Sequence, residues 1–104
     1  MISLSTAALE QIRHSAQTGA LQSIPLRIAV KQLEDNSLHY AMGFDEKKLP
    51  GDTFYNFDGV DLVVSTGSKG LADGMTIDYV ELEPGKLEFI FLNPNDPAYV
   101  PPTT

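Results

Sequence analysis

The chain has 104 residues, enough for one domain, and its 14 acidic against 7 basic residues give a net charge of -7. A surface of that sign repels phosphate backbones and anionic lipid headgroups, so we expect neither nucleic acid nor membranes as partners. The absence of cysteine excludes disulfides, thiolate catalysis and a thiolate-held cluster within one chain. No apolar run approaches the roughly 20 residues that span a bilayer, and the first three residues lack the basic start of a signal peptide. We therefore expect a cytoplasmic protein.

The first predicted element is a helix that begins after Ser5 and ends at Gly19. Ser5 is of the residue type that caps helix N-termini, and glycine is common where helices end. Leu9, Ile12 and Ala16 fall on one face at helical spacing. That face is predicted to pack on the core.

Two hairpins are predicted next. Residues 25–33 alternate apolar and polar side chains, as a strand with one buried face does. The run 38–44 also alternates, and residues 34–37 between the two runs have turn chemistry. Further along, Asp58-Gly59 separates two apolar runs, which is the strongest short hairpin signal.

The remaining chain is predicted to form one short helix and two strands. Residues 65–73 favour one or two helical turns, and residues 75–79 alternate as a strand. The apolar run 86–92 favours a central strand packed on both faces, and Asn93-Pro94-Asn95 stops it. The order of elements predicts an α+β fold of mostly antiparallel hairpins.

From Ile2 to Asn95, the order and spacing of these patterns resemble the HesB-like family of A-type iron-sulfur cluster carriers. The resemblance implies a compact β-rich domain over residues 1–95, with mostly antiparallel curved sheets, an N-terminal helix and one short helix. It also implies dimers or tetramers, and it leaves residues 96–104 as a Pro-rich tail. The matching pieces are Leu-Ser-x-x-Ala-x-x-x-Ile at 4–12, Pro-Leu-Arg-Ile-Ala-Val-Lys at 25–31, Asp-Gly-Val at 58–60, Leu-x-x-Gly at 71–74 and Phe-x-Phe-x-Asn-Pro-Asn at 89–95.

The family's cysteines are missing from this sequence. Family members carry one cysteine at the first hairpin turn and two in the tail, and the resemblance places these positions at Asp35, Val100 and Pro102. Val and Pro offer no ligand atom, and a carboxylate is a hard oxygen donor, whereas iron-sulfur clusters take thiolates or at most imidazole. We therefore expect the fold to be kept, the cluster chemistry to be lost and no cofactor to be bound.

The hairpin turn also raises the question of another metal site. Glu34, Asp35 and His39 lie close together in the sequence, and carboxylate with imidazole is a common ligand combination. A solvated acidic turn beside a half-exposed histidine is the favoured interpretation, because no supporting ligand can be named from the sequence. The Asp35 and His39 site is kept as the alternative.

Three functions are compatible with these residues. The first is an accessory protein that binds itself, a related A-type carrier or other iron-sulfur assembly proteins without a cluster of its own. The second is a small-molecule or metal-binding module that uses the former cluster pocket. The third, a cluster carrier with other ligands, is least favoured by the ligand chemistry. No nucleophile and base are paired in the sequence, so we do not expect an enzyme.

Overall fold

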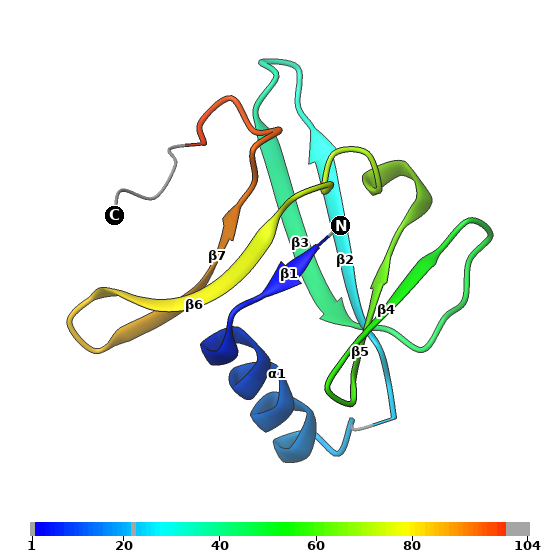
Figure 1. Ribbon diagram of the computed structural model, residues 1–104, viewed down its shortest axis with the longest axis vertical. Coiled ribbons are helices and arrows are strands. Elements are labelled where there is room, and N and C mark those ends of the chain that lie inside the picture. The colour runs from blue at the N-terminus through cyan, green and yellow to red at the C-terminus, as the bar shows by residue number, and fades with distance from the viewer. Residues whose placement is uncertain (1, 22, 100–104) are drawn as a thin grey trace.

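The computed structural model describes residues 2–21 and 23–99, and its elements confirm the α+β class (Figure 1). None of the helices within these residues is long and apolar enough to cross a membrane. The elements in chain order are β1 (Ser3–Leu4), α1 (Thr6–Thr18), β2 (Leu26–Gln32), β3 (Leu38–Phe44), β4 (Thr53–Phe57), β5 (Val60–Val64), the short 3-10 helix η1 (Thr66–Ser68), β6 (Thr76–Glu83) and β7 (Lys86–Leu92).

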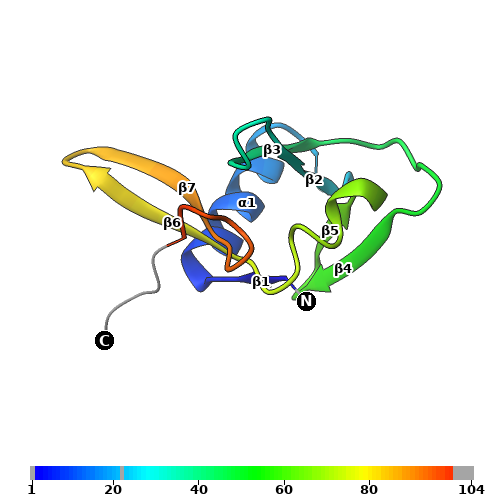
Figure 2. The same ribbon diagram turned by 90° about the horizontal axis from the view of Figure 1, so that it is seen from above.

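The strands form two sheets. One has four strands in the order β3-β2-β5-β4, and the other has three in the order β1-β6-β7. The pairs β2–β3 and β4–β5 are antiparallel, which confirms the two predicted hairpins, and β6–β7 is a third antiparallel pair. The pairs β1–β6 and β2–β5 are parallel and join segments that are distant in the sequence. Figure 2 shows the β6–β7 hairpin extending away from the rest of the molecule.

The core is enclosed by α1, the inner face of the four-stranded sheet and β6. Leu26, Ile28 and Val30 are buried and face the core, as the alternation in the sequence predicts. Ile12 and Ala8 reach the core from α1, which lies between the two sheets in Figure 2.

Helix α1 has the predicted ends. The Ser5 side chain accepts a hydrogen bond from the Ala8 backbone N–H at 3.0 Å, and Gly19 is the C-cap. The Ser5 hydroxyl also donates to Asp78 Oδ1 at 2.6 Å. One capping residue therefore satisfies the helix N-terminus and joins it to β6.

The prediction of residues 86–92 as a central strand is wrong. β7 is the edge strand of its sheet, with β6 between it and β1, and none of its residues is buried. Phe91 stacks on Tyr40 with 4.6 Å between ring centroids, and Phe89 meets Tyr79 at 4.7 Å. Aromatic contacts thus cover the inner half of β7, while Leu87 is 54% exposed where the hairpin leaves the body. A run of apolar residues indicates an apolar strand, but it does not indicate how many other strands pair with that strand.

The connection after β5 contains the predicted short helix, which is the single turn η1. Its last residue, Ser68, is buried, and its hydroxyl accepts from the Val30 backbone N–H at 2.8 Å and donates to the Val30 carbonyl at 3.1 Å. Strand β5 pairs with β2 only from Leu26 to Ile28. Ser68 therefore continues the hydrogen bonding of β2 beyond the end of β5.

Candidate functional site

The turn between β2 and β3 holds the first of the predicted ligand positions. Asp35 is exposed, and its Oδ1 accepts from the Ser37 backbone N–H at 3.0 Å and from the Ser37 hydroxyl at 2.5 Å. These bonds, the hydroxyl's first, lower the pKa of Asp35. Asn36 adopts a left-handed φ of 71°, which asparagine tolerates in turns. The carboxylate thus closes the turn on its own backbone.

His39 lies on β3 with its side chain exposed, on the outer face of the sheet. Its cross-strand partner in β2 is Lys31, whose positive charge would repel a metal ion bound at His39. Within residues 2–21 and 23–99, no three His, Asp or Glu side chains are grouped as metal ligands. The Asp35 and His39 site stays a prediction.

The end of β7 is anchored by Asn93, a role that the sequence did not reveal beyond its turn chemistry. Asn93 is fully buried, and its Nδ2 donates to the Leu71 carbonyl at 2.7 Å. Its Oδ1 accepts from the Asn95 backbone N–H at 3.0 Å, and Asn95 Nδ2 donates to the Asp73 carbonyl at 2.7 Å. The Asn-Pro-Asn stop is therefore fastened to the connection that precedes β6.

Tyr40 of β3 holds the next part of the chain. Its hydroxyl donates to Asp96 Oδ2 at 2.7 Å, while its ring stacks on Phe91. Burial, and then the hydrogen bond to Asp96, raises the pKa of Tyr40 to about 12. Asp96 in turn accepts from the backbone N–H groups of Ala98 and Tyr99. We call this set, Tyr40, Phe91, Asn93 and Asp96, the tail anchor.

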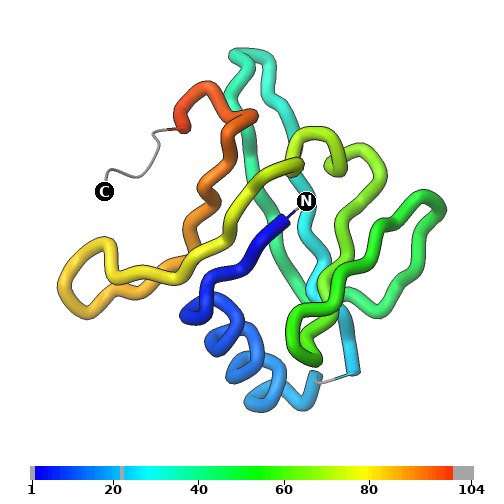
Figure 3. Tube along the Cα trace, in the orientation of Figure 1, coloured from blue at the N-terminus to red at the C-terminus, as the bar shows by residue number. Residues whose placement is uncertain are grey.

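The tail anchor places the start of the tail beside the β2–β3 hairpin. Figure 3 shows the chain reaching that hairpin just after β7 before it turns back, and the Tyr40–Asp96 bond joins the two segments. The predicted positions Val100 and Pro102 lie outside the described residues. The structure thus brings the tail's start to β3, while the ligand positions of the tail itself stay a prediction.

Arg27 fixes the other end of the hairpin, a role that no pattern in the sequence indicates. Its Nη1 and Nη2 donate to the two carboxylate oxygens of Asp52, both at 2.8 Å, and its Nε donates to Asp45 Oδ2 at 2.9 Å. The Arg27 and Asp52 side chains are only 12% and 3% exposed. The hydrogen bond from Arg27 lowers the pKa of Asp52 to about 2. A strand residue thereby holds the loop between β3 and β4, as paired guanidinium–carboxylate bonds do.

No family model matches the chain. An uncharacterised protein of Bradyrhizobium diazoefficiens is 32% identical over 95 residues, which cover 91% of this chain and 89% of that protein. The iron-sulfur cluster insertion protein ErpA of Marinobacter nauticus is 32% identical over 88 residues, which cover 85% of this chain and 79% of that protein. The crystal structure of IscA with its 2Fe-2S cluster is similar with a TM-score of 0.74 at 25% identity, covering 90% of this chain and 86% of that one. The chain belongs to the HesB-like family of A-type iron-sulfur cluster carriers, as a divergent member without cysteine.

The side chains of this chain do not fit an iron-sulfur cluster. The one predicted ligand position that the structure describes, Asp35, presents a carboxylate that Ser37 already holds. The sequence supplies no thiolate for any other position, and iron-sulfur clusters depend on thiolates. The hairpin turn therefore presents a donor that does not suit the cluster.

Proposed function

We propose that this chain is an accessory protein of iron-sulfur cluster assembly that acts by binding protein and carries no cluster of its own. Its partners are a second copy of itself, a related A-type carrier or other assembly proteins. In this proposal the chain is not an enzyme and works as an oligomer in the cytoplasm. Membership of the carrier family supports a role in iron-sulfur cluster assembly. The lack of thiolates at the predicted ligand positions supports the loss of cluster binding.

The tail anchor is the observation that carries the proposal. Asn93 and the Tyr40–Asp96 bond hold the start of the tail beside the hairpin, although Asp35, Val100 and Pro102 supply no thiolate. A fold does not determine function, because function resides in particular sites. A chain that keeps the tail beside the hairpin but lacks the thiolates can therefore use this surface to bind a protein partner.

The second candidate, a small-molecule or metal-binding module in the former cluster pocket, has less support. Three pockets of the structure are lined by residues from α1, the β4–β5 hairpin, the outer face of β2 and β3, and the region around Ala72. Neither Asp35 nor residues 96–99 belong to their linings. Protein binding is therefore the function we propose.

Light scattering of purified proteins tests this proposal. The full chain is measured alone and mixed with a cysteine-containing A-type carrier, beside a variant that lacks residues 97–104. We expect the full chain to form dimers or larger assemblies, or a mixed complex, because the tail starts at a fixed place and can extend across a partner. A monomeric mass alone and no complex in the mixture would refute the proposal, and unchanged assembly of the shortened variant would exclude the tail from it.

A further inference from the structure

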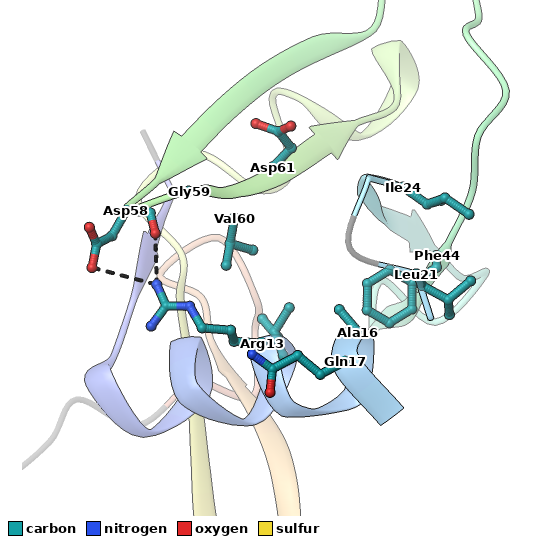
Figure 4. Close-up of a pocket in the computed structure, with 11 residues that line it drawn as sticks. Arg13, Ala16, Gln17, Leu21, Ile24, Phe44, Asp58, Gly59, Val60 and Asp61 are labelled. Carbon is teal, nitrogen blue, oxygen red and sulfur yellow. Dashed lines mark hydrogen bonds and ion pairs between the residues drawn. The ribbon is translucent and has the colours of Figure 1, made fainter. Parts of the chain in front are cut away.

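A pocket of about 160 Å³ lies between the second half of α1 and the β4–β5 turn and is lined by none of the residues of the tail anchor (Figure 4). Its wall is mostly apolar, and four polar side chains stand around it. The apolar lining consists of Ile12, Ala16, Leu21, Ile24, Phe44 and Val60, and the other lining residues are Arg13, Gln17, Asp58, Gly59 and Asp61.

Small residues line the pocket on both sides. Ala16 is buried on α1 yet has only a methyl group to fill the space before Phe44. Gly59 on the opposite turn has no side chain, and a Cβ at that position would meet nothing within 4 Å. A dry apolar cavity of about 150 Å³ accepts one benzene ring. The pocket therefore has room for a single aromatic ring.

Two hydrogen-bond donors of α1 stand at the pocket. Arg13 Nη2 donates to the Asp58 carbonyl at 2.7 Å and lies 3.5 Å from the Asp58 carboxylate, while Nε and Nη1 have no partner within the described residues. The side chain of Gln17, one turn further along, makes no hydrogen bond within the described residues either, and Figure 4 shows it beside Arg13. Arg13 is thus held in place with donors to spare.

The acidic side chains around the pocket are engaged or directed to solvent. The Asp58 side chain is 86% exposed, and Asp61 Oδ1 accepts from Asn56 Nδ2 at 2.8 Å. These two carboxylates outnumber the single guanidinium, and the whole chain carries a net charge of -7. This negative field repels an anionic ligand, and the positive guanidinium of Arg13 repels a cationic ligand in the pocket. A neutral ligand avoids both costs.

We propose that this pocket binds a small neutral aromatic molecule with one carbonyl group, its ring against Ala16, Val60 and Phe44 and its oxygen accepting from Arg13 or Gln17. Most small-molecule sites share this combination of an apolar wall and a few polar groups that fix orientation. The inference is independent of the proposed protein binding, because the pocket and the tail anchor share no residue.

Three probes of one shape and different charge test the proposal by amide NMR titration of the full chain: benzamide, benzoate and benzylamine. We expect benzamide to shift the amide signals of residues 16–17 and 58–61 and to bind about tenfold or more tightly than the two charged probes. Benzamide that leaves these signals unchanged up to its solubility, or benzylamine that binds best, would overturn the proposal.

Filling the pocket provides the matched control. Ala16→Leu inserts a side chain into the cavity and is expected to weaken benzamide binding about tenfold or more, whereas Ala7→Leu, at an exposed position of the same helix, leaves it unchanged. Val60→Phe fills the cavity from the opposite wall and is the second variant if Ala16→Leu does not fold. Wild-type affinity in a folded pocket-filling variant would contradict the assignment.

Discussion

Arg27 shows how one side chain can order a segment that has no regular structure. It binds Asp45, Asp52, Ser65 and the Lys47 carbonyl, so the loop between β3 and β4 and the end of β5 converge on one residue of β2. A guanidinium suits this place because its five N–H donors are fixed in one plane. Lysine has no such fork and would not replace it.

Acid should weaken the fold through Asp52. Its pKa of about 2 lies below the ordinary value of 3.8, so the folded state favours the charged carboxylate. The resulting stability is complete above pH 3.8 and is lost as the pH falls toward 2. We expect Asp52→Asn to be less stable than the wild type at pH 7, and the gap between their urea midpoints to narrow between pH 4 and pH 2. A gap independent of pH would contradict this role, and Asp61→Asn, at an exposed carboxylate, is the control.

The exposed histidine of the hairpin should be dispensable. His39 is exposed opposite Lys31, and no hydrogen bond of its side chain is present within the described residues. His39→Ala is therefore expected to change the free energy of unfolding by less than about 0.5 kcal/mol and to leave a titration with divalent metal ions unchanged. A metal-dependent rise in melting temperature that is lost in this variant would instead establish the Asp35 and His39 site.

At the scale of elements, the tail anchor couples β3 to the segment after β7. Tyr40 contributes its ring to Phe91 and its hydroxyl to Asp96, and Asp96 accepts from the Ala98 backbone N–H with its carboxylate and from the Tyr99 backbone N–H with its carbonyl. Because Asp96 has a fixed position, the chain beyond it starts from a defined place beside the hairpin.

Removing the Tyr40 hydroxyl should loosen this turn without unfolding the domain. Tyr40→Phe keeps the ring and is expected to cost about 0.5–1.5 kcal/mol, the usual net value of one hydrogen bond. Hydrogen exchange at the Ala98 and Tyr99 amides should accelerate, while Tyr79→Phe, whose hydroxyl makes no hydrogen bond within the described residues, leaves it unchanged. Unaltered exchange in Tyr40→Phe would show that the bond does not order the turn.

High pH gives a second test of the same bond. The pKa of Tyr40 is raised from 10.0 to about 12, so the folded state favours the neutral phenol. This contribution is complete below pH 10 and is lost as the pH rises toward 12. The stability difference between wild type and Tyr40→Phe should therefore shrink between pH 10 and pH 12 in urea titrations.

At the scale of the whole molecule, local patterns were enough to predict the helix and the hairpins but not how they assemble. The Ser5 cap, the alternation from Leu26 to Val30 and the Asp58-Gly59 turn act between near neighbours, so the sequence displays them. The parallel pairs, the short β1 and the edge position of β7 depend on segments far apart in the chain.

The sequence likewise predicts some features of the candidate site and not others. Missing cysteines can be read directly, and Asp35 is indeed at the hairpin turn. The bonds Tyr40–Asp96, Asn93–Leu71 and Arg27–Asp52 each join residues more than 20 positions apart. No spacing or composition signals such partners, and only the folded chain reveals that the first joins the hairpin to the start of the tail, the second fastens the end of β7 and the third holds the loop between β3 and β4.

Reconstitution with iron and sulfide under oxygen-free conditions tests the central claim most directly, which is that this carrier fold is kept while cluster binding is lost. The absorption spectrum of the purified chain is recorded after excess iron and sulfide are removed, with a cysteine-containing A-type carrier treated in parallel. We predict no charge-transfer absorption from this chain, because Asp35, Val100 and Pro102 provide no thiolate. A stable cluster spectrum in stoichiometric amount would contradict the claim.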